Sequence, residues 1–176
     1  IYGALGKEDG TIIDIGGAST EVCCRKEGKI VTAVSLNVGA VRLYDWCKDE
    51  REALLNTIKE KVTALAGVNL SGRVVAIGGT ATTLASIKLE LLQYDAKKIQ
   101  DFEMTAEEVR MLAEKLISLS KEERKVLRGM DEKRADIIAG GALLLAEIMS
   151  TCKIERIYVS DRDNLEGYLI LKGQAL

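Results

Sequence analysis

Two segments of the chain combine the residue types with which proteins hold phosphate groups. Thr11 to Thr20 reads TIIDIGGAST, and Arg73 to Thr82 reads RVVAIGGTAT. In each segment a run of apolar, mostly β-branched residues predicts a buried strand, and Ile-Gly-Gly with small or hydroxyl residues comes directly after it. Consecutive glycines let the backbone approach a ligand closely and turn successive N–H groups toward one anion, while Ser and Thr add donors. We therefore interpret both segments as phosphate-binding turns.

The two segments differ in the element to which each one leads and in one charged residue. The second leads into a helical pattern, so the N–H groups of Gly79, Thr80 and Ala81 would lie at the positive end of a helix dipole. The first leads into another strand and carries Asp14 where the second carries Ala76. Burying an unpaired carboxylate in a strand is costly, so we expect Asp14 at the end of its strand, facing a cation or water. Mg²⁺ is the natural partner, because it takes carboxylate oxygens and keeps waters beside substrate phosphates.

A purely structural origin for the two turns is the alternative. Gly-Gly at a strand end commonly forms only a tight turn, and Asp commonly caps one. The recurrence of the pattern within one α/β chain favours phosphate binding, because such folds bind ligands in the crevices beyond their strand ends. Neither segment is a Walker loop (G-x-x-x-x-G-K-[ST]) or a dinucleotide fingerprint (G-x-G-x-x-G).

Composition restricts the chemistry and the partners of the chain. Its 176 residues fit one domain, and its formal charge of -2 provides no basic surface for wrapping nucleic acid. The sequence has no histidine, which excludes Ser-His and Cys-His nucleophile pairs and the commonest zinc ligand. The longest apolar stretch, Ile137 to Ala146, is far short of the roughly 20 residues that cross a bilayer. We expect neither a nucleic acid nor a membrane as partner, and acid or base work falls to carboxylates, Lys, Tyr or bound water.

The cysteines indicate the compartment. Cys23, Cys24, Cys47 and Cys152 contain no C-x-x-C pair, and adjacent strand residues point to opposite faces. We expect reduced, buried thiols in a cytoplasmic protein. The chain begins at Ile1 and enters a predicted strand almost directly, so we expect a fragment of a longer protein.

An α/β layered domain must position the two turns. The pattern predicts a three-stranded meander, then helices, and later strands between crossover helices. Thr105 and Glu108 form a capping box ahead of one helix, and the alternating charges of Lys121 to Arg128 predict a solvated helix face. The expected strands are Thr11–Ile15, Ser19–Arg25, Lys29–Leu36, Arg73–Ile77 and Arg156–Asp161, and the expected helices are Ala40–Cys47, Asp49–Ala66, Thr80–Leu92, one after Thr105, Asp131–Met149 and Asn164–Leu171.

Five motifs in order give the chain a resemblance to a known family. DIGGASTEV, LNVGAVRL, AIGGTATTLASI, KRADIIAGGALLLAEIM and YVSDRDNLEGYLI closely resemble the exopolyphosphatase and guanosine pentaphosphate phosphohydrolase (Ppx/GppA) family over nearly the whole chain. The resemblance implies a ribonuclease-H-like lobe of the sugar kinase, Hsp70 and actin superfamily, with a mixed sheet led by the meander. Residues 1–176 would form a single domain, the C-terminal lobe of a two-lobe phosphatase whose N-terminal lobe is absent here.

The resemblance also assigns residues. It implies that Asp14 binds the metal, that Glu21 adjoins it in the catalytic site, and that two loops bind phosphate. Many family members read D-I-G-G-G-S-T-E, whereas this chain has Ala18, which costs one methyl group of clearance and leaves its N–H available. The implied phosphate-binding residues are Gly16, Gly17, Ala18, Ser19 and Thr20 in the first loop and Gly78, Gly79 and Thr80 in the second.

Two arginines and a glycine pair have competing interpretations. Arg42 could reach a phosphate, or it could pair with Asp45 from a helix start. For Arg134 a structural pair with Asp131 or Asp136 is the stronger interpretation. Two glycines inside the helix of Asp131 to Met149, at positions 140 and 141, cost about 1 kcal/mol each against Ala, which indicates close backbone packing more than ligand contact.

The implied activity is hydrolysis of a terminal phosphate of inorganic polyphosphate or guanosine pentaphosphate by water, assisted by Mg²⁺. The resemblance places a further phosphate loop and a water-activating glutamate in the absent N-terminal lobe, so we expect residues 1–176 alone to bind phosphate weakly with little or no turnover. Two other functions stay open: the ATP-binding lobe of a kinase or reductase activator of the same superfamily, and a non-catalytic sensor of guanosine tetraphosphate. A homodimer is also compatible with the sequence.

Overall fold

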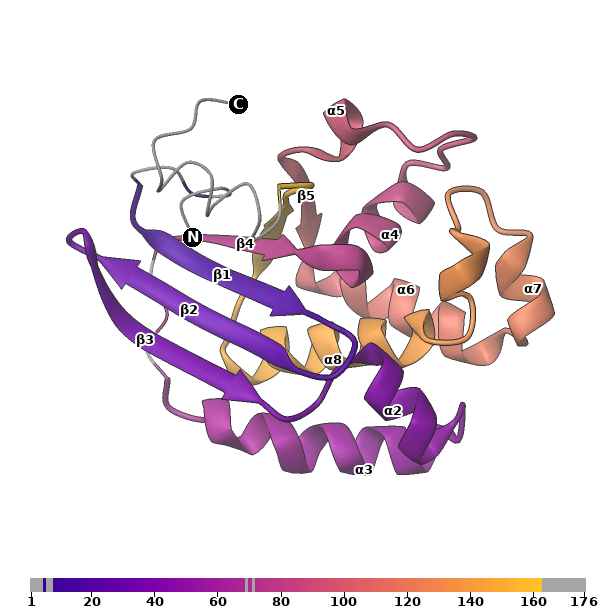
Figure 1. Cartoon of the computed structure of the whole chain (residues 1–176), viewed down its shortest axis with the longest axis horizontal. Helices are drawn as coiled ribbons and strands as arrows, with labels where there is room; N and C mark the ends of the chain where they lie inside the picture. Colours follow the sequence, from indigo (N-terminus) through magenta and orange to yellow (C-terminus); the bar gives the residue numbers. More distant parts are fainter. Residues whose placement is uncertain (1–4, 6–7, 69, 71, 163–176) are drawn as a thin grey trace.

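Six strands form one mixed sheet in the order β3-β2-β1-β4-β6-β5 (Figure 1). The computed structural model describes residue 5, residues 8–68, residue 70 and residues 72–162. The first three strands pair antiparallel as a meander, β4 lies parallel to β1, β6 lies parallel to β4, and β5 pairs antiparallel with β6. The strands are β1 (Gly10–Ile15), β2 (Thr20–Lys26), β3 (Lys29–Leu36), β4 (Arg73–Ile77), β5 (Phe102–Thr105) and β6 (Arg156–Val159).

The meander results from its turn chemistry. Glu27 and Gly28 connect β2 to β3 with φ values of 52° and 72°. A two-residue hairpin with positive φ at both positions matches the twist of the flanking strands. The carboxylate of Asp9 accepts hydrogen bonds from both backbone amides of this turn. The predicted meander is therefore present, with β2 shifted by one residue.

The helices differ from the sequence prediction mainly in short elements. The expected helix of Asp131 to Met149 is a 3-10 turn followed by α8, and α4 begins at Gly78, two residues before the expected start. α5 and β5 were not predicted, because elements of four residues are too short to show a period. The expected closing helix of Asn164 to Leu171 lies outside the described residues. The helices are α2 (Ala40–Cys47), α3 (Arg51–Val62), η1 (Thr63–Leu65), α4 (Gly78–Lys88), α5 (Ala96–Ile99), α6 (Ala106–Ser118), α7 (Lys121–Lys125), η2 (Glu132–Arg134) and α8 (Ile138–Thr151).

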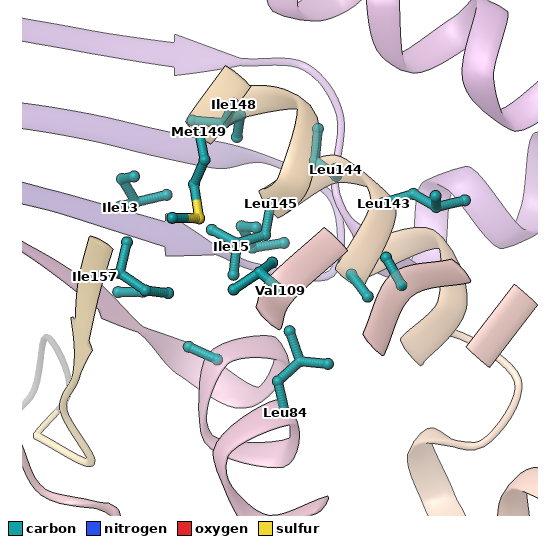
Figure 2. Close-up of a cluster of buried hydrophobic side chains, with 14 of the residues drawn as sticks. Ile13, Ile15, Leu84, Val109, Leu143, Leu144, Leu145, Ile148, Met149 and Ile157 are labelled. Atoms are coloured by element: carbon teal, nitrogen blue, oxygen red, sulfur yellow. The ribbon is translucent and has the colours of Figure 1, made fainter. Parts of the chain in front are cut away.

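The α8 helix is the centre of the main core. Figure 1 shows it behind the meander, with α2 and α3 beside it. Its apolar side chains pack against Ile13 and Ile15 of β1, Ile157 of β6 and Val109 of α6 (Figure 2). Fully burying one such side chain contributes about 1.5–3 kcal/mol. The core thus holds α8 against the sheet. This packing fixes the position of the first turn of α8 relative to the ends of β1 and β4.

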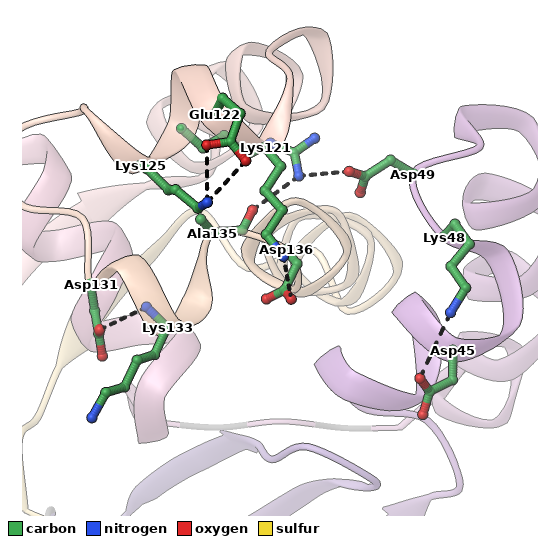
Figure 3. Close-up of polar contacts among 11 residues, drawn as sticks. Asp45, Lys48, Asp49, Lys121, Glu122, Lys125, Asp131, Lys133, Ala135 and Asp136 are labelled. Carbon is green, nitrogen blue, oxygen red and sulfur yellow. Dashed lines mark hydrogen bonds and ion pairs between the residues drawn. The ribbon is translucent and has the colours of Figure 1, made fainter.

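The charged residues of α7 form the predicted solvated face except at one position. At Arg124 the prediction of a solvated side chain was wrong. Arg124 is 1% exposed, and its guanidinium donates to the Leu116 carbonyl at 2.6 Å and the Ala135 carbonyl at 3.2 Å. It also forms an ion pair of 2.9 Å with Asp49 (Figure 3 labels Asp49 and Ala135). A buried guanidinium is stable only when its donors are satisfied, and the three acceptors come from α6, from the segment between η2 and α8, and from the loop before α3. Arg124 therefore ties α6, α7 and α8 to the loop before α3.

The four cysteines are free thiols. Cys24 and Cys47 are buried, and Cys23 and Cys152 are half-buried. Burial raises the pKa of the Cys23 and Cys152 thiols, which lowers the population of the reactive thiolate at neutral pH. None of the helices within the described ranges is long and apolar enough to cross a membrane.

Candidate phosphate-binding site

The structure brings the two glycine turns together. Asp14 of β1 is the register partner of Ile77 of β4, and the two strands are parallel, so the turns at their ends leave the sheet at the same edge. Both turns border one small cavity of about 220 Å³. Its wall contains Asp14, Gly16 and Gly17 from the first turn, Gly78, Gly79 and Thr80 from the second, and Ala40, Val41, Arg134 and Ile137 from the helices nearby.

The first turn is held by the start of α2. The Gly16 carbonyl accepts from the Ala40 amide at 3.0 Å, and the Gly17 carbonyl accepts from the Arg42 amide at 3.0 Å. A Cβ atom on Gly39 would lie 2.5 Å from the Gly16 carbonyl oxygen, so this close approach requires glycine. Because the carbonyls of the turn face α2, the turn's orientation is fixed before any ligand binds.

Not every polar group that the family resemblance assigns to the first turn is open to a ligand. The Gly16 amide closes the turn by donating to the Ser19 carbonyl at 3.0 Å. The Thr20 hydroxyl is buried and donates to the Val38 carbonyl at 2.7 Å. Gly17 and Ala18 are exposed at the tip. The geometry therefore offers the amides at the tip to a ligand, and it gives Thr20 a structural bond.

Two carboxylates lie side by side on one face of the sheet. Asp14 and Glu21 are directly paired across β1 and β2, and paired residues of antiparallel strands point to the same face. The next strand adds Ser35 opposite Glu21, and its hydroxyl donates to Glu21 Oε1 at 3.0 Å. Asp14 is half-buried at the cavity wall. Among the described residues no group of three His, Cys, Asp or Glu side chains comes close enough to hold a metal ion together.

The second turn opens α4 with amides that the N-cap side chain does not satisfy. Gly78 has a φ of +83°, and the N-cap residue Ile77 has no side-chain oxygen to accept from the first amides. The free N–H groups of a helix start attract anions. Thr80 is buried, and its hydroxyl would lie 2.8 Å from a Cβ atom on Gly141 of α8. Glycine at position 141 therefore serves close packing, as predicted, and leaves room for the buried Thr80 side chain.

Arg134 supplies the positive charge of this cavity. A Cβ atom on Gly79 would overlap the guanidinium of Arg134, so the arginine lies directly on the second glycine turn. Its Nε also lies 3.7 Å from Asp131 Oδ2. The expected pair with Asp131 is present, but an ion pair of this length between half-exposed side chains is weak and leaves donors of the guanidinium for a ligand. The predicted pair with Asp131 is thus confirmed, and the guanidinium also lies on the second glycine turn.

A comparison with known protein families decides the classification. The model of the Ppx/GppA phosphatase family matches residues 1–172. The chain belongs to the Ppx/GppA phosphatase family.

The names of curated relatives include a phosphatase, an exopolyphosphatase and a pyrophosphatase. The chain is 32% identical over 95% of its length to the bifunctional 3-dehydroquinate synthase/phosphatase of Fusobacterium nucleatum, of which it covers 26%. It is 27% identical over 89% of its length to exopolyphosphatase 2 of Mycobacterium tuberculosis, of which it covers 53%. It is 26% identical over 90% of its length to the guanosine-5'-triphosphate,3'-diphosphate pyrophosphatase of Pseudoalteromonas translucida, of which it covers 32%. The chain spans about half or less of these relatives.

A solved structure confirms the predicted fold. The crystal structure of the Aquifex aeolicus Ppx/GppA family member superposes with a TM-score of 0.86 at 24% identity, covering 98% of this chain and 60% of that one. The mixed sheet with flanking helices is thus the α/β fold that the sequence predicted, and the solved Ppx/GppA structure shares it.

One arginine of the family motifs takes a position that neither sequence interpretation described. The Arg42 guanidinium lies over the ring of Trp46, 5.6 Å from its centroid. Asp45, the partner that we considered for it, lies 4.0 Å from Lys48 (Figure 3). The Arg42 backbone amide nevertheless holds the Gly17 carbonyl, so this position of the Ppx/GppA motif supports the first turn through its main chain.

A second, larger cavity adjoins the small one in this Ppx/GppA chain. It has a volume of about 600 Å³ and also borders Gly78, Gly79 and Arg134. The remaining wall comes from α4, from the segment of residues 91–94, from residues 127–131 and from Asp161. Sequence analysis missed this cavity, because its walls come from four separate parts of the chain.

Proposed function

We propose that this chain forms one phosphate-binding face of a hydrolase that releases terminal phosphate from inorganic polyphosphate or guanosine pentaphosphate. The observation that carries the proposal is the single cavity bordered by both glycine turns, Asp14 and Arg134. The names of the exopolyphosphatase and pyrophosphatase relatives support the same reaction class.

The residues of the cavity divide the work of holding a phosphate. The amide of the exposed Gly17 donates to its oxygens from one side, and the amides of Gly79 and Thr80 donate from the start of α4. Arg134 adds charge-assisted hydrogen bonds, for which a planar guanidinium is well suited. Groups fixed in this way stabilise the charge that spreads over the phosphoryl oxygens during transfer. Thr20 serves the site by holding the base of the first turn.

The donor set fits Mg²⁺, which we propose as the cofactor. Mg²⁺ is commonly bound by one or two carboxylates together with substrate phosphates and water. Asp14 at the cavity wall, with Glu21 beside it on the same face, provides such a pair. Bound there, the ion would neutralise charge on the phosphoryl oxygens. The chain's own contribution is to hold Asp14 at the wall through the pairing of β1 with β2 and β4.

The proposal also covers the longer protein of which this chain would be one lobe. Since the chain covers 53% of exopolyphosphatase 2 and 60% of the Aquifex structure, we propose that a further lobe closes the cleft over the cavity and supplies the group that activates water. The free thiols fit a reducing compartment, and we propose a cytoplasmic location.

Isothermal titration with tripolyphosphate, in the presence and absence of Mg²⁺, tests the proposal. We expect Asp14→Asn to weaken the Mg²⁺-dependent affinity at least about tenfold, equivalent to about 1.4 kcal/mol. Asp45→Asn is the matched control, because Asp45 is an exposed aspartate that pairs with Lys48 outside the cavity. Equal affinities of wild type and Asp14→Asn would refute the site. Phosphate release by the 176-residue chain at the rate of a full-length family member would refute the need for a further lobe.

A further inference from the structure

Three polar side chains form a row across the meander, and two of them are the carboxylates beside the phosphate cavity. The strand register pairs Asp14 of β1 with Glu21 of β2, and it pairs Glu21 with Ser35 of β3. The three strands lie side by side (Figure 1). Directly paired residues of antiparallel strands point to the same face, with Cβ atoms about 4.5–5.5 Å apart. Asp14 thus lies at the inner end of the row, at the cavity wall, and Ser35 lies at its outer end.

The Glu21 carboxylate is held from the side of β3. The Ser35 hydroxyl donates to Glu21 Oε1 at 3.0 Å. Within the part of the chain that the structure describes, this is the only hydrogen bond of the Glu21 side chain, and the carboxylate takes part in no ion pair. The two C–O bonds of a carboxylate diverge, so an oxygen bonded toward β3 leaves Oε2 directed away from β3. A carboxylate has acceptor capacity for several partners, and that of Oε2 is unused.

The neighbouring carboxylate gives this bond a purpose. Like charges directly opposite each other on neighbouring strands repel, so Asp14 disfavours the position of Glu21 in the row. A glutamate side chain has several rotatable bonds, and ordering it costs conformational entropy. Without a partner, Glu21 would turn away from Asp14 into solvent. The hydrogen bond from Ser35 opposes both effects, because it satisfies part of the negative charge and fixes the orientation of the group.

The position of the Ser35 donor is itself fixed. The next residue, Leu36, is buried in the main core. The Thr20 hydroxyl donates to the Val38 carbonyl at 2.7 Å and ties the exit of β3 to the start of β2. A serine hydroxyl is separated from the backbone by one torsion with three staggered positions. The donor therefore stands on a rigid element, as a residue that orients a ligand of a metal must.

We propose that Ser35 is a positioning residue: its hydroxyl holds Glu21 so that Oε2 is available, together with Asp14, to a Mg²⁺ ion beside the bound phosphate. Ser35 itself touches neither the ion nor the phosphate. Removing a residue that orients a metal ligand by a hydrogen bond typically weakens metal binding about 10- to 100-fold. The inference rests on the proposed function, because it requires the pair of carboxylates to bind Mg²⁺.

Calorimetric titration of the 176-residue chain with tripolyphosphate, with and without MgCl₂, tests the role of Ser35. We expect Ser35→Ala to weaken the affinity measured with Mg²⁺ about tenfold and to leave the affinity without Mg²⁺ unchanged, because the glycine turns and Arg134 are intact. Ser35→Thr keeps the hydroxyl and should restore the wild-type affinity. Thr32→Val is the matched control, because it removes a hydroxyl from the other face of the same strand, where Thr32 pairs with Cys24.

A double-mutant cycle shows whether Ser35 acts through Glu21. In a Glu21→Gln background, Ser35→Ala should cause no further loss of the affinity that depends on Mg²⁺. A loss of the same size in both backgrounds would overturn the positioning role. An equal loss in the absence of Mg²⁺ would overturn it as well, since it would show that the bond only stabilises the edge strand. Ser35→Thr that binds as weakly as Ser35→Ala would overturn the role of the hydroxyl.

The results also separate the inference from the function on which it rests. Equal affinities of wild type and Ser35→Ala with Mg²⁺, together with a loss in Asp14→Asn, would overturn the inference and leave the phosphate site in place. If neither substitution changes the affinity with Mg²⁺, the metal site is overturned, and the role of Ser35 falls with it.

Discussion

The Oδ1 atom of Asp14 lies 2.7 Å from the position that a Cβ atom on Gly78 would occupy. The register of the parallel strands produces this contact, because Asp14 is paired with Ile77, the residue before Gly78. Gly78 also has a φ of +83°, where any other residue is strained. Position 78 therefore requires glycine for two independent reasons, one in its own backbone and one in the carboxylate of the neighbouring strand.

Replacing Gly78 by alanine should affect both stability and ligand binding. We expect Gly78→Ala to lower the free energy of unfolding by about 1–3 kcal/mol, because of the backbone strain, and to weaken tripolyphosphate binding by displacing Asp14. Gly28→Ala is the matched control: Gly28 has a φ of 72° but no atom within 4 Å of an added Cβ. Urea denaturation and calorimetry of both variants measure the two effects. Unchanged ligand binding in Gly78→Ala would show that its contact with Asp14 has no role in the site.

Arg134 should matter for phosphate affinity and little for stability. A hydrogen bond to a charged group contributes about 1.5–3 kcal/mol, so we expect Arg134→Ala to weaken tripolyphosphate binding at least about tenfold. Its surface ion pair with Asp131 should change the free energy of unfolding by less than about 1 kcal/mol. Arg156→Ala removes an exposed arginine paired with Glu103 at the opposite end of the sheet, and should change neither quantity much. A similar loss of affinity in both variants would indicate a non-specific effect of net charge.

Arg124 should show the reverse pattern. Removing it leaves Asp49 and two carbonyls without their buried donor, so we expect Arg124→Ala to lower the free energy of unfolding by about 3–5 kcal/mol. Arg110→Ala is the comparison, because Arg110 pairs with Glu107 on the exposed face of α6 and should cost less than about 1 kcal/mol. Urea denaturation of the two variants measures both losses. Equal losses would mean that the buried contacts of Arg124 do not stabilise the packing of α7.

The capping box of α6 predicts a pH dependence. The Thr105 amide donates to Glu108 Oε2 at 2.9 Å, and this bond, followed by the nearby Lys88, lowers the pKa of Glu108 below its ordinary value of 4.5. Glu108 therefore stabilises the fold fully above pH 4.5, and this contribution is lost as the pH falls through the lower pKa of the folded state. Glu108→Gln keeps an acceptor but does not titrate. We expect wild type to lose stability relative to Glu108→Gln between about pH 5 and pH 3, and a constant difference over that range would contradict the role of the charge.

Local features of the sequence were sufficient to predict much of the fold. The meander depends on a hairpin turn with Gly28 and on strands of β-branched residues, and the capping box at Thr105 begins α6 where the pattern placed it. Each of these signals lies within a few residues of the structure that it produces. By contrast, β5 has four residues and exists through its pairing with β6, more than 50 positions later in the chain. No local pattern reports such a pairing.

The sequence alone determined that two glycine turns come after buried strands, that one of them carries a carboxylate, and that histidine chemistry is excluded, because these properties belong to residue types and their order. Only the tertiary structure decided that β1 and β4 are parallel neighbours, that Arg134 lies on Gly79, and that the Gly16 amide and the Thr20 hydroxyl are already bonded. It also decided that Leu92, Tyr94, Leu127 and Asp161 border a cavity beside the phosphate site. The reason is physical: a site is made of distances between residues far apart in the chain, and the packing of α4 and α8 against the sheet sets those distances.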